Sequence, residues 1–220
     1  MAWVTDGLIE TMRARGGRLP FLERHLARLR QSVAELGLHA PAGDVAELAR
    51  AAARGGGDGV VRIEVRDGRA AVTTGPVPSV DPPSVIIAEV PHAPYPHKTT
   101  ARGRFEEAHA EAQRAGADDA LLATASGHVA EGTVWSLFWW DGDELCTPAA
   151  DLGILPGVGR ARVMELAEVA EVRVTVASFA GRSLFLVNAV RGIVRIGSFR
   201  GRDVPLDART AELSHRFWPD

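Results

Sequence analysis

The sequence has few of the features that identify disulfide-bonded, membrane or exported proteins. Its 220 residues include a single cysteine, Cys146, which excludes an internal disulfide and fits a reducing compartment. No apolar run approaches the length of a membrane span. The first residues, MAWVTDGLIETMRARGG, lack a basic region followed by an apolar one, so we expect no signal peptide. We therefore expect a cytoplasmic protein that does not enter a membrane.

Strong charge and the common metal and hydrolase motifs are missing as well. The net charge is −3, with 24% charged and 46% hydrophobic residues, as in an ordinary globular protein. This balance suggests neither nucleic acid nor an anionic membrane as a partner. There is no paired cysteine and no HExxH pattern, so we expect no metal site. The absence of a GxSxG elbow weighs against an α/β-hydrolase.

What is present begins with a strand, two helices and a hairpin. The expected elements are a strand over residues 3–15, helices over 21–38 and 45–53, a strand over 61–66 and its hairpin partner through Val72. The first helix has one apolar stripe at steps of three and four residues. His25 lies at the edge of this stripe and Arg28 on its flank, so the pattern alone makes both solvated residues.

Residues 75–98 separate two parts of the chain. Seven of the thirteen prolines lie here, as in a linker, interrupted by one expected strand over 85–90. We place a domain boundary near residue 92, which gives a small α/β domain (1–91) and a larger domain (92–220). Further expected elements are strands over 118–124, 172–176, 184–188 and 193–196, and helices over 105–115 and 209–217. Because helices and strands do not alternate regularly, we predict an α+β (mixed α/β) fold with mixed sheets.

Residues 131–160 are the most informative stretch of the chain. A bulky run at 134–140 predicts a strand buried on both faces. The Asp-Gly-Asp that follows predicts a hairpin turn, which leads to a second strand at 144–147. A loop with three glycines follows, and then a helix over 161–170. The free N–H groups of such a helix start can bind an anion. With the carboxylate of Glu131 at the other end, the stretch suits a phosphorylated cofactor with a basic ring. The alternative to an anion site is a loop whose glycines have only a structural, capping role.

The lysine that precedes this stretch is the candidate nucleophile. Lys98 is the only lysine in the chain and lies in a loop framed by prolines. A loop lysine is ordinarily solvated. Its position ahead of Glu131 and the glycine loop favours a Schiff-base lysine instead. Cys146, inside an expected strand, is more simply a core residue than a nucleophile.

Six segments resemble a known family, in the family's order and over most of the chain. They are LIETMR (8–13), HLARLRQSVAELG (25–37), HKTTARGRFEEA (97–108), DDALLATASGHVAEGTVWSLF (118–138), TPAADLGILPGVGR (147–160) and LFLVNAVRGI (184–193). The chain resembles the class IV, fold-type IV enzymes that depend on pyridoxal 5'-phosphate. These include branched-chain and D-amino-acid transaminases and 4-amino-4-deoxychorismate lyase. The HKTT, GILPGV and NAVRG segments are most similar to the lyase branch.

The resemblance implies a cofactor site. Lys98 would form the Schiff base and move protons, and Glu131 would pair with the pyridinium nitrogen. Arg28 would contact the phosphate and would therefore not be the solvated residue that the pattern alone predicts. The backbone amides of Val158 and Gly159 would cradle the same phosphate.

The resemblance also implies residues for substrate and catalysis, with some departures. Thr11 would donate a proton in the lyase branch, and Arg62 would bind a substrate carboxylate. Ala189 stands at the cofactor-binding position where Ser or Thr often bonds the phosphate, although alanine occurs in lyases. Three further positions differ from the usual residue of the family, which leaves the choice of substrate open: Ala101, Phe105 and Ser136.

Two activities share the residues named above. A lyase would convert 4-amino-4-deoxychorismate to 4-aminobenzoate and pyruvate. A class IV aminotransferase would act on branched-chain or D-amino acids. A third possibility, a non-catalytic protein that binds a phosphate compound, would need neither Lys98 nor Glu131. The expected partners are a small-molecule amine and, by family resemblance, a second copy of the chain in a homodimer.

Overall fold

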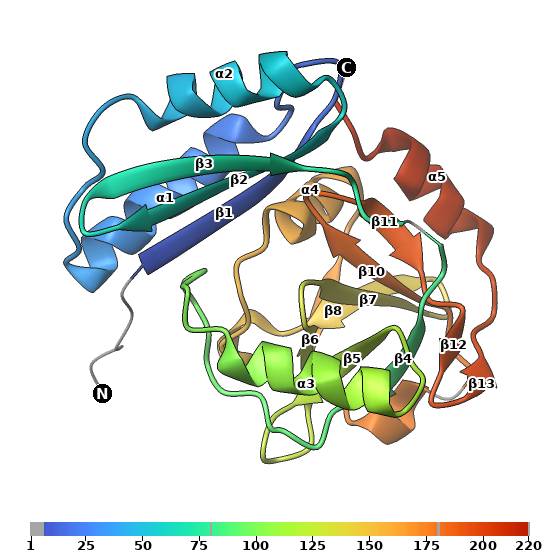
Figure 1. Ribbon diagram of the computed structural model, residues 1–220. Helices are drawn as coiled ribbons and strands as arrows, with labels where there is room; N and C mark the ends of the chain where they lie inside the picture. Colours follow the sequence, from blue (N-terminus) through green and yellow to red (C-terminus); the bar gives the residue numbers. More distant parts are fainter. Residues whose placement is uncertain (1–6, 80, 180, 220) are drawn as a thin grey trace.

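The computed structural model describes residues 7–79, 81–179 and 181–219 (Figure 1). The first sheet is antiparallel, in the order β1-β2-β3, and two helices cover one of its faces. Its elements are β1 (Gly7–Ala14), α1 (Leu22–Leu36), α2 (Val45–Gly56), β2 (Gly59–Arg66) and β3 (Arg69–Gly75). Apolar side chains of both helices pack on β1 and β2 to form a separate core under this sheet.

Local sequence accounts for both helices of this layer. The apolar stripe of α1 faces the sheet, with Leu22, Leu26 and Leu29 all buried. The helix ends at Gly37, whose φ of 63° is a left-handed conformation that glycine adopts without strain. The carboxylate of Asp44 caps α2 by accepting a hydrogen bond from the backbone N–H of Glu47 at 3.0 Å. The two predicted helices are confirmed, and α2 extends three residues further than expected, to Gly56.

Two five-stranded sheets form the rest of the molecule. The second sheet has the order β11-β10-β7-β8-β9. Its strands are β7 (Ser136–Asp141), β8 (Glu144–Pro148), β9 (Ala170–Val172), β10 (Leu184–Asn188) and β11 (Gly192–Arg195). The third sheet has the order β13-β12-β4-β5-β6. Its strands are β4 (Ser84–Ile87), β5 (Asp119–Ala123), β6 (Val129–Gly132), β12 (Ser198–Phe199) and β13 (Arg202–Asp203).

Three helices and two short 3-10 turns complete the chain. They are α3 (Gly103–Arg114), η1 (Ala150–Leu152), α4 (Val158–Leu166), η2 (Val176–Phe179) and α5 (Ala208–Arg216). Helix α3 packs on the third sheet, and α4 and α5 pack on the second. Within the described residues, no helix is both long and apolar enough to cross a membrane.

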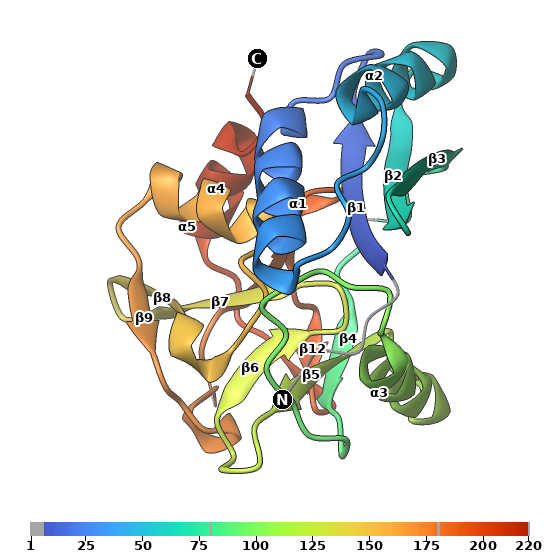
Figure 2. The ribbon, with the colours of Figure 1, turned by 90° about the vertical axis from the view of Figure 1, so that its left-hand side faces the viewer.

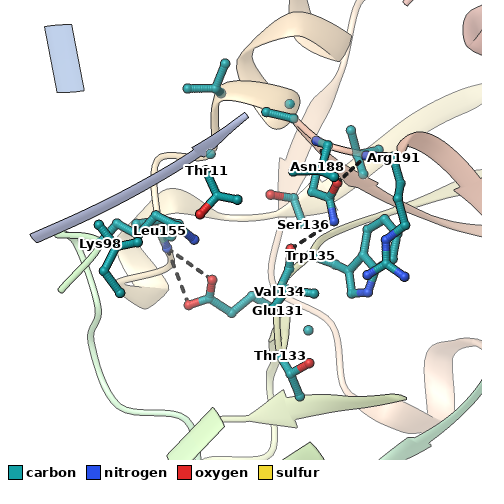
Figure 3. Close-up of a pocket in the computed structure, with 18 of the residues that line it drawn as sticks. Thr11, Lys98, Glu131, Thr133, Val134, Trp135, Ser136, Leu155, Asn188 and Arg191 are labelled. Atoms are coloured by element: carbon teal, nitrogen blue, oxygen red, sulfur yellow. Dashed lines mark hydrogen bonds between the residues drawn. The ribbon is translucent and has the colours of Figure 1, made fainter. Parts of the chain in front are cut away.

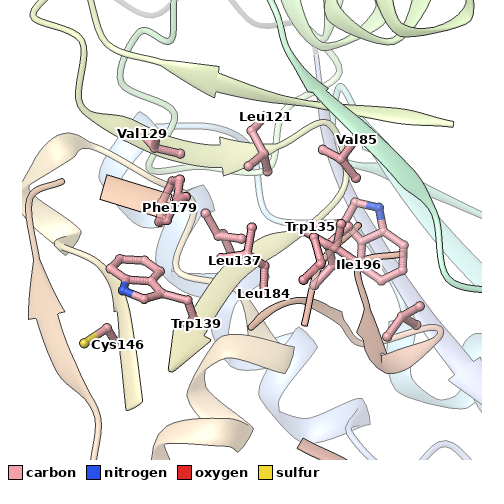
Figure 4. Packing of buried hydrophobic residues seen from close by; sticks show 13 residues of the cluster. Val85, Leu121, Val129, Trp135, Leu137, Trp139, Cys146, Phe179, Leu184 and Ile196 are labelled. Atoms are coloured by element: carbon pink, nitrogen blue, oxygen red, sulfur yellow. The ribbon is translucent and has the colours of Figure 1, made fainter. Parts of the chain in front are cut away.

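The largest core lies between the second and third sheets (Figure 4). Leu137 of β7 points into it, whereas the next residue, Phe138, stacks on Phe185 at 5.4 Å on the opposite face. The predicted burial of this strand on both faces is therefore confirmed. Cys146 of β8 is a buried core residue, and burial raises the pKa of its thiol to about 11. Its interpretation as a core residue is also confirmed.

The first sheet joins the rest of the molecule through α1 and through β1, whose Arg13 N–H donates to the carbonyl of Ala189 at 3.0 Å. Figure 2 shows α1 beside α4 and α5. Arg24 of α1 donates to Glu165 of α4 at 2.8 Å, and the rings of Phe21 and Phe217 lie 5.6 Å apart, edge to face. These contacts hold α1 against the helices that pack on the second sheet.

Several local predictions were wrong. Helix α4 ends at Leu166, and residues 170–172 pair with β8 as β9 instead of continuing the helix. The strand expected over 172–176 is replaced by the end of β9 and the start of η2. Strand β6 was not predicted, because its sequence, VAEG, consists mostly of residue types that are depleted in strands. Residues 3–6 of the first expected strand lie outside the described residues.

The strand pairing bears on the predicted domain boundary near residue 92. Strand β4 lies before this boundary, but it pairs in parallel with β5 and β12, which both lie after it. Each of these partners belongs to the third sheet. The division into residues 1–91 and 92–220 stays a prediction.

Candidate active site

A pocket of about 270 Å³ lies where the first sheet faces the other two. Its walls come from β1, α1 and β2 on one side, and from β6, β7, the start of α4 and the turn after β10 on the other. All eight candidate residues from the sequence line this one pocket: Thr11, Arg28, Arg62, Lys98, Glu131, Val158, Gly159 and Ala189. Their roles stay predictions, but the structure brings them together from segments far apart in the chain.

Lys98 is positioned by backbone pairing with β1. The carbonyl of Lys98 accepts a hydrogen bond from the N–H of Ile9 at 2.8 Å, and Thr99 bridges to Leu8. The hydroxyl of Tyr95 donates to the carbonyl of Thr99 at 2.7 Å and fixes the other side of the loop. The lysine is thus held at the wall of the pocket by the start of the first sheet.

The environment of Lys98 favours its neutral form. Burial lowers the pKa of its amine to about 7, and the positive charges of Arg28 and Arg102 act in the same direction. The carboxylates of Glu10 and Glu131 oppose this shift without cancelling it. A large share of Lys98 is therefore a free amine near pH 7, as a nucleophile requires.

Glu131 is a buried carboxyl group with weak partners (Figure 3). Both of its oxygens lie 3.4 Å from the backbone nitrogen of Leu155, and His92 Nδ1 lies 3.7 Å from Oε1. Burial raises the pKa of Glu131 to about 8 and lowers the pKa of His92. A positively charged group in the pocket would restore the ionised form of this carboxyl.

Arg28 belongs to a buried network that the sequence pattern did not reveal. Its guanidinium donates to both oxygens of Glu10, at 2.9 and 2.6 Å, and His25 Nδ1 lies 2.6 Å from the same carboxylate. Burial alone would raise the pKa of Glu10, but Arg28 and His25 lower it to about 2. The pattern-based interpretation of His25 and Arg28 as solvated residues was wrong. His25 is 1% exposed, because the edge of the α1 stripe meets Glu10 of β1.

Arg28 also approaches the start of α4. Its Nη1 donates to the carbonyl of Pro156 at 3.0 Å. The N-cap of α4 is Gly157, which provides no side-chain hydrogen bond, so the first amides of the helix have no acceptor within it. A positively charged side chain and a free helix N-terminus thus meet at one corner of the pocket, which favours an anion there.

The two glycines of this corner are required by close packing. A Cβ on Gly159 would lie 2.9 Å from the carbonyl carbon of Asn188, and one on Gly157 would lie 2.9 Å from Ser136 Oγ. The helix start can therefore approach β7 and the end of β10 only with glycine at these two positions. Asn188 shapes this turn, since its Oδ1 accepts from the N–H groups of Val190 and Arg191 at 3.0 and 2.8 Å. This role of Asn188 was not predicted.

Thr11 and Arg62 are direct partners in the β1–β2 ladder, so their side chains share one face. In Figure 3 the hydroxyl of Thr11 projects into the pocket from β1. Arg62 contacts Glu64 at 3.3 Å, and its side chain is 41% exposed, as expected of a rim residue. Ser136 and Phe105, two of the departures from the family pattern, also line the pocket, whereas Ala101 is exposed and does not.

These groups fit pyridoxal phosphate. Its aldehyde requires a neutral amine, its ring nitrogen a buried carboxylate, and its phosphate a set of free N–H donors. Lys98, Glu131 and the start of α4 offer these three groups around one pocket. Among the described residues, no group of three or more His, Cys, Asp or Glu side chains could hold a metal ion.

Comparison with known families agrees with this geometry. The family described as "Amino-transferase class IV" matches residues 7–199. The chain belongs to this family. Class IV aminotransferases are pyridoxal-phosphate enzymes, so the prediction of an enzyme with this cofactor is confirmed. A comparison with curated proteins gives no match.

Solved structures share the whole fold, which confirms the predicted fold class. A protein of Mesorhizobium loti, provisionally assigned as an amino-acid aminotransferase, is 31% identical, with a TM-score of 0.80 over 88% of this chain and 99% of that one. A provisionally assigned 4-amino-4-deoxychorismate lyase of Legionella pneumophila is 23% identical, with a TM-score of 0.85 over 96% and 91%. An aminotransferase of Brucella abortus bound to pyridoxal phosphate is 22% identical, with a TM-score of 0.81 over 98% and 90%.

Proposed function

We propose that this class IV enzyme is a 4-amino-4-deoxychorismate lyase that forms 4-aminobenzoate and pyruvate. The observation that carries the proposal is the hydroxyl of Thr11, which projects into the pocket that Lys98 lines (Figure 3). The lyase-like segments HKTT, GILPGV and NAVRG support it. The structural likeness to the Legionella protein agrees with it at the level of the fold.

The residues around the cofactor hold it and handle protons. When bound, pyridoxal phosphate supplies an electron sink for the carbon that bears the substrate amine. Lys98 would hold the cofactor and, as a free amine, would remove the proton from that carbon, a role that its pKa of about 7 suits. Glu131 would accept a hydrogen bond from the protonated ring nitrogen. The first amides of α4, with Arg28 beside them, would hold the phosphate.

The lyase and aminotransferase reactions differ in the last proton transfer. Elimination of the enolpyruvyl group as pyruvate needs a proton at that group as its ether bond breaks. Thr11 is the side chain we assign to this transfer, and Arg62, beside it in the sheet, would hold a substrate carboxylate. A general acid in this position contributes about 10²–10⁴-fold to the rate.

The second candidate is an aminotransferase for branched-chain or D-amino acids. The likeness to the Mesorhizobium protein, which is 31% identical, favours it. In this reaction the only side chain we assign to proton transfer would be Lys98. Thr11 would then only pack against its neighbours.

Product analysis separates the two. The purified protein, loaded with cofactor, is incubated with aminodeoxychorismate and, separately, with pairs of amino acids and keto acids. We expect 4-aminobenzoate and pyruvate in equal amounts from the first incubation. Steady amino transfer without any 4-aminobenzoate would exclude the lyase and leave the family assignment unchanged. The homodimer that the resemblance implies stays a prediction, which light scattering of the loaded protein would test.

A further inference from the structure

Arg191 lines the pocket and has unused hydrogen-bond donors. Its guanidinium carbon lies 3.9 Å from the centre of the Trp135 ring (Figure 3). Its Nε is buried and has no hydrogen-bond partner within the part of the chain that the structure describes. Its Nη1 lies 3.5 Å from the carbonyl of Ser79, which is longer than an ordinary hydrogen bond.

The other arginines of the pocket are better satisfied. Arg28 is paired with Glu10, Arg62 contacts Glu64, and Arg102 donates to the carbonyl of Thr133 at 2.7 Å. Of the four arginines that line this pocket in the described residues, Arg191 alone makes no side-chain hydrogen bond shorter than 3.5 Å. A guanidinium stays charged in proteins, and within the described residues Arg191 forms no ion pair, although the charge of Asp119 acts on it.

The stacking surface under Arg191 is held rigidly. Trp135 Nε1 donates to one carboxylate oxygen of Asp119 at 2.8 Å, and the hydroxyl of Thr133 donates to the other at 2.5 Å. Asp119 is buried, and its two oxygens are used by these donors and by the N–H of Ala120. The backbone of Arg191 is fixed in turn by the side chain of Asn188 at 2.8 Å. These contacts orient the guanidinium and leave its donors free.

We propose that Arg191, stacked on Trp135, binds a carboxylate of the substrate. A planar carboxylate is the natural partner of a free guanidinium edge. Figure 3 shows Lys98 and Arg191 at opposite sides of the pocket, with Glu131 between them. A substrate that contacts both residues has its amine and a carboxylate at different ends of the molecule, as across a six-membered ring. An ordinary α-amino acid has only one carbon between the two groups.

The proposal rests on the proposed lyase function for the choice of ring substrate. Aminodeoxychorismate and its product 4-aminobenzoate both have a carboxylate para to the amine. Arg191 would bind this ring carboxylate, whereas Arg62, on the first sheet, would bind the carboxylate of the enolpyruvyl group. The two arginines line opposite walls of the pocket, so one substrate with two carboxylates can contact both.

Calorimetric titration of the cofactor-loaded protein with 4-aminobenzoate, and separately with aniline, tests the subsite without turnover. We expect Arg191→Gln to weaken 4-aminobenzoate binding by roughly ten- to a hundredfold and to leave aniline binding unchanged. Arg191→Lys should restore only part of the affinity, because an ammonium cannot stack or donate in pairs. The control is Arg195→Gln, in the next strand, which is exposed and outside the pocket.

Equal affinity of the wild type and Arg191→Gln for 4-aminobenzoate would overturn the subsite, as would an equal loss for aniline. No measurable binding of 4-aminobenzoate to the wild type would also overturn it. The absorbance of bound cofactor and the melting temperature show that each variant is folded and loaded. With aminodeoxychorismate, KM should rise much more than kcat falls. A wild type that makes no 4-aminobenzoate contradicts the lyase, whereas an unchanged KM in the variant contradicts only the subsite.

Discussion

The backbone nitrogen of Leu155 lies 3.4 Å from each carboxylate oxygen of Glu131. This forked contact is long, and the side chain is buried, so the carboxyl group is poorly stabilised as an anion by the protein alone. Burial raises its pKa to about 8. A protonated ring nitrogen would stabilise the ionised form of this carboxyl group. Without the cofactor, the stability of the protein should therefore depend on whether Glu131 is protonated.

The first prediction concerns the stability of the cofactor-free protein against pH. The folded protein keeps a proton on Glu131 that the unfolded chain releases above about pH 4.5, so this group lowers stability as pH rises towards 8. Glu131→Gln removes this loss. From pH 5 to pH 7, the unfolding free energy of the variant should rise by on the order of 1–3 kcal/mol relative to that of the wild type.

Urea unfolding of both proteins at the two pH values measures this difference. All other titratable groups are common to both proteins, and repeating the comparison in a His92→Gln background removes the imidazole that lies 3.7 Å from Glu131. Glu107→Gln, at an exposed position of α3, is the matched control and should show no such trend. If the difference in unfolding free energy between Glu131→Gln and the wild type does not increase with pH, Glu131 is not a buried, protonated carboxyl group.

The second prediction uses the single lysine of the chain. Borohydride should fix the cofactor to Lys98, and peptide mass spectrometry should find the label on the segment that contains HKTT. Lys98→Ala should remain unlabelled, although the pocket and the start of α4 are unchanged. Label on the N-terminal amine alone, or equal labelling of the variant, would show that Lys98 does not hold the cofactor.

The third prediction concerns the buried pair of Arg28 and Glu10. Arg28→Met should cost about 3–5 kcal/mol of unfolding free energy, because it leaves the carboxylate of Glu10 buried without its main partner. Chemical denaturation measures this cost. Arg50→Met, which removes an exposed arginine paired with Glu23, is the control and should cost less than about 1 kcal/mol.

The double variant Glu10→Gln/Arg28→Met separates stability from cofactor binding. It no longer buries an unpaired charge, so part of the lost stability should return. Its affinity for pyridoxal phosphate should remain roughly ten- to a hundredfold below that of the wild type, since the charge beside the phosphate corner is still missing. Full recovery of both properties would mean that Arg28 has only a structural role.

The fourth prediction distinguishes the chemistry of Thr11. Thr11→Ala should lower lyase turnover by about 10²-fold or more, whereas Thr11→Ser, which keeps the hydroxyl, should retain most of it. Labelling of Lys98 by borohydride should be the same in both variants. If the alanine variant turns over aminodeoxychorismate as fast as the serine variant, the proton comes from another group.

Much of the fold followed from local patterns. The stripe of α1 and the hairpin of β2 and β3 depend on neighbours a few residues apart, so periodicity and turn residues were sufficient to predict them. The order of Lys98, Glu131 and the glycine loop indicated a cofactor site before any distance was known. Strand β6, whose sequence VAEG has little strand propensity, gave no such signal, although it carries Glu131.

The sequence by itself thus determined the family, the cofactor and the residues expected around it, because these depend on the type and order of side chains. Only the tertiary structure decided which of these side chains have partners. His25 is buried against Glu10 because α1 packs on β1, and Arg191 is stacked on Trp135 because the turn after β10 meets the start of β7. Burial and pairing depend on the surface that each element meets, and segments distant in the chain supply that surface.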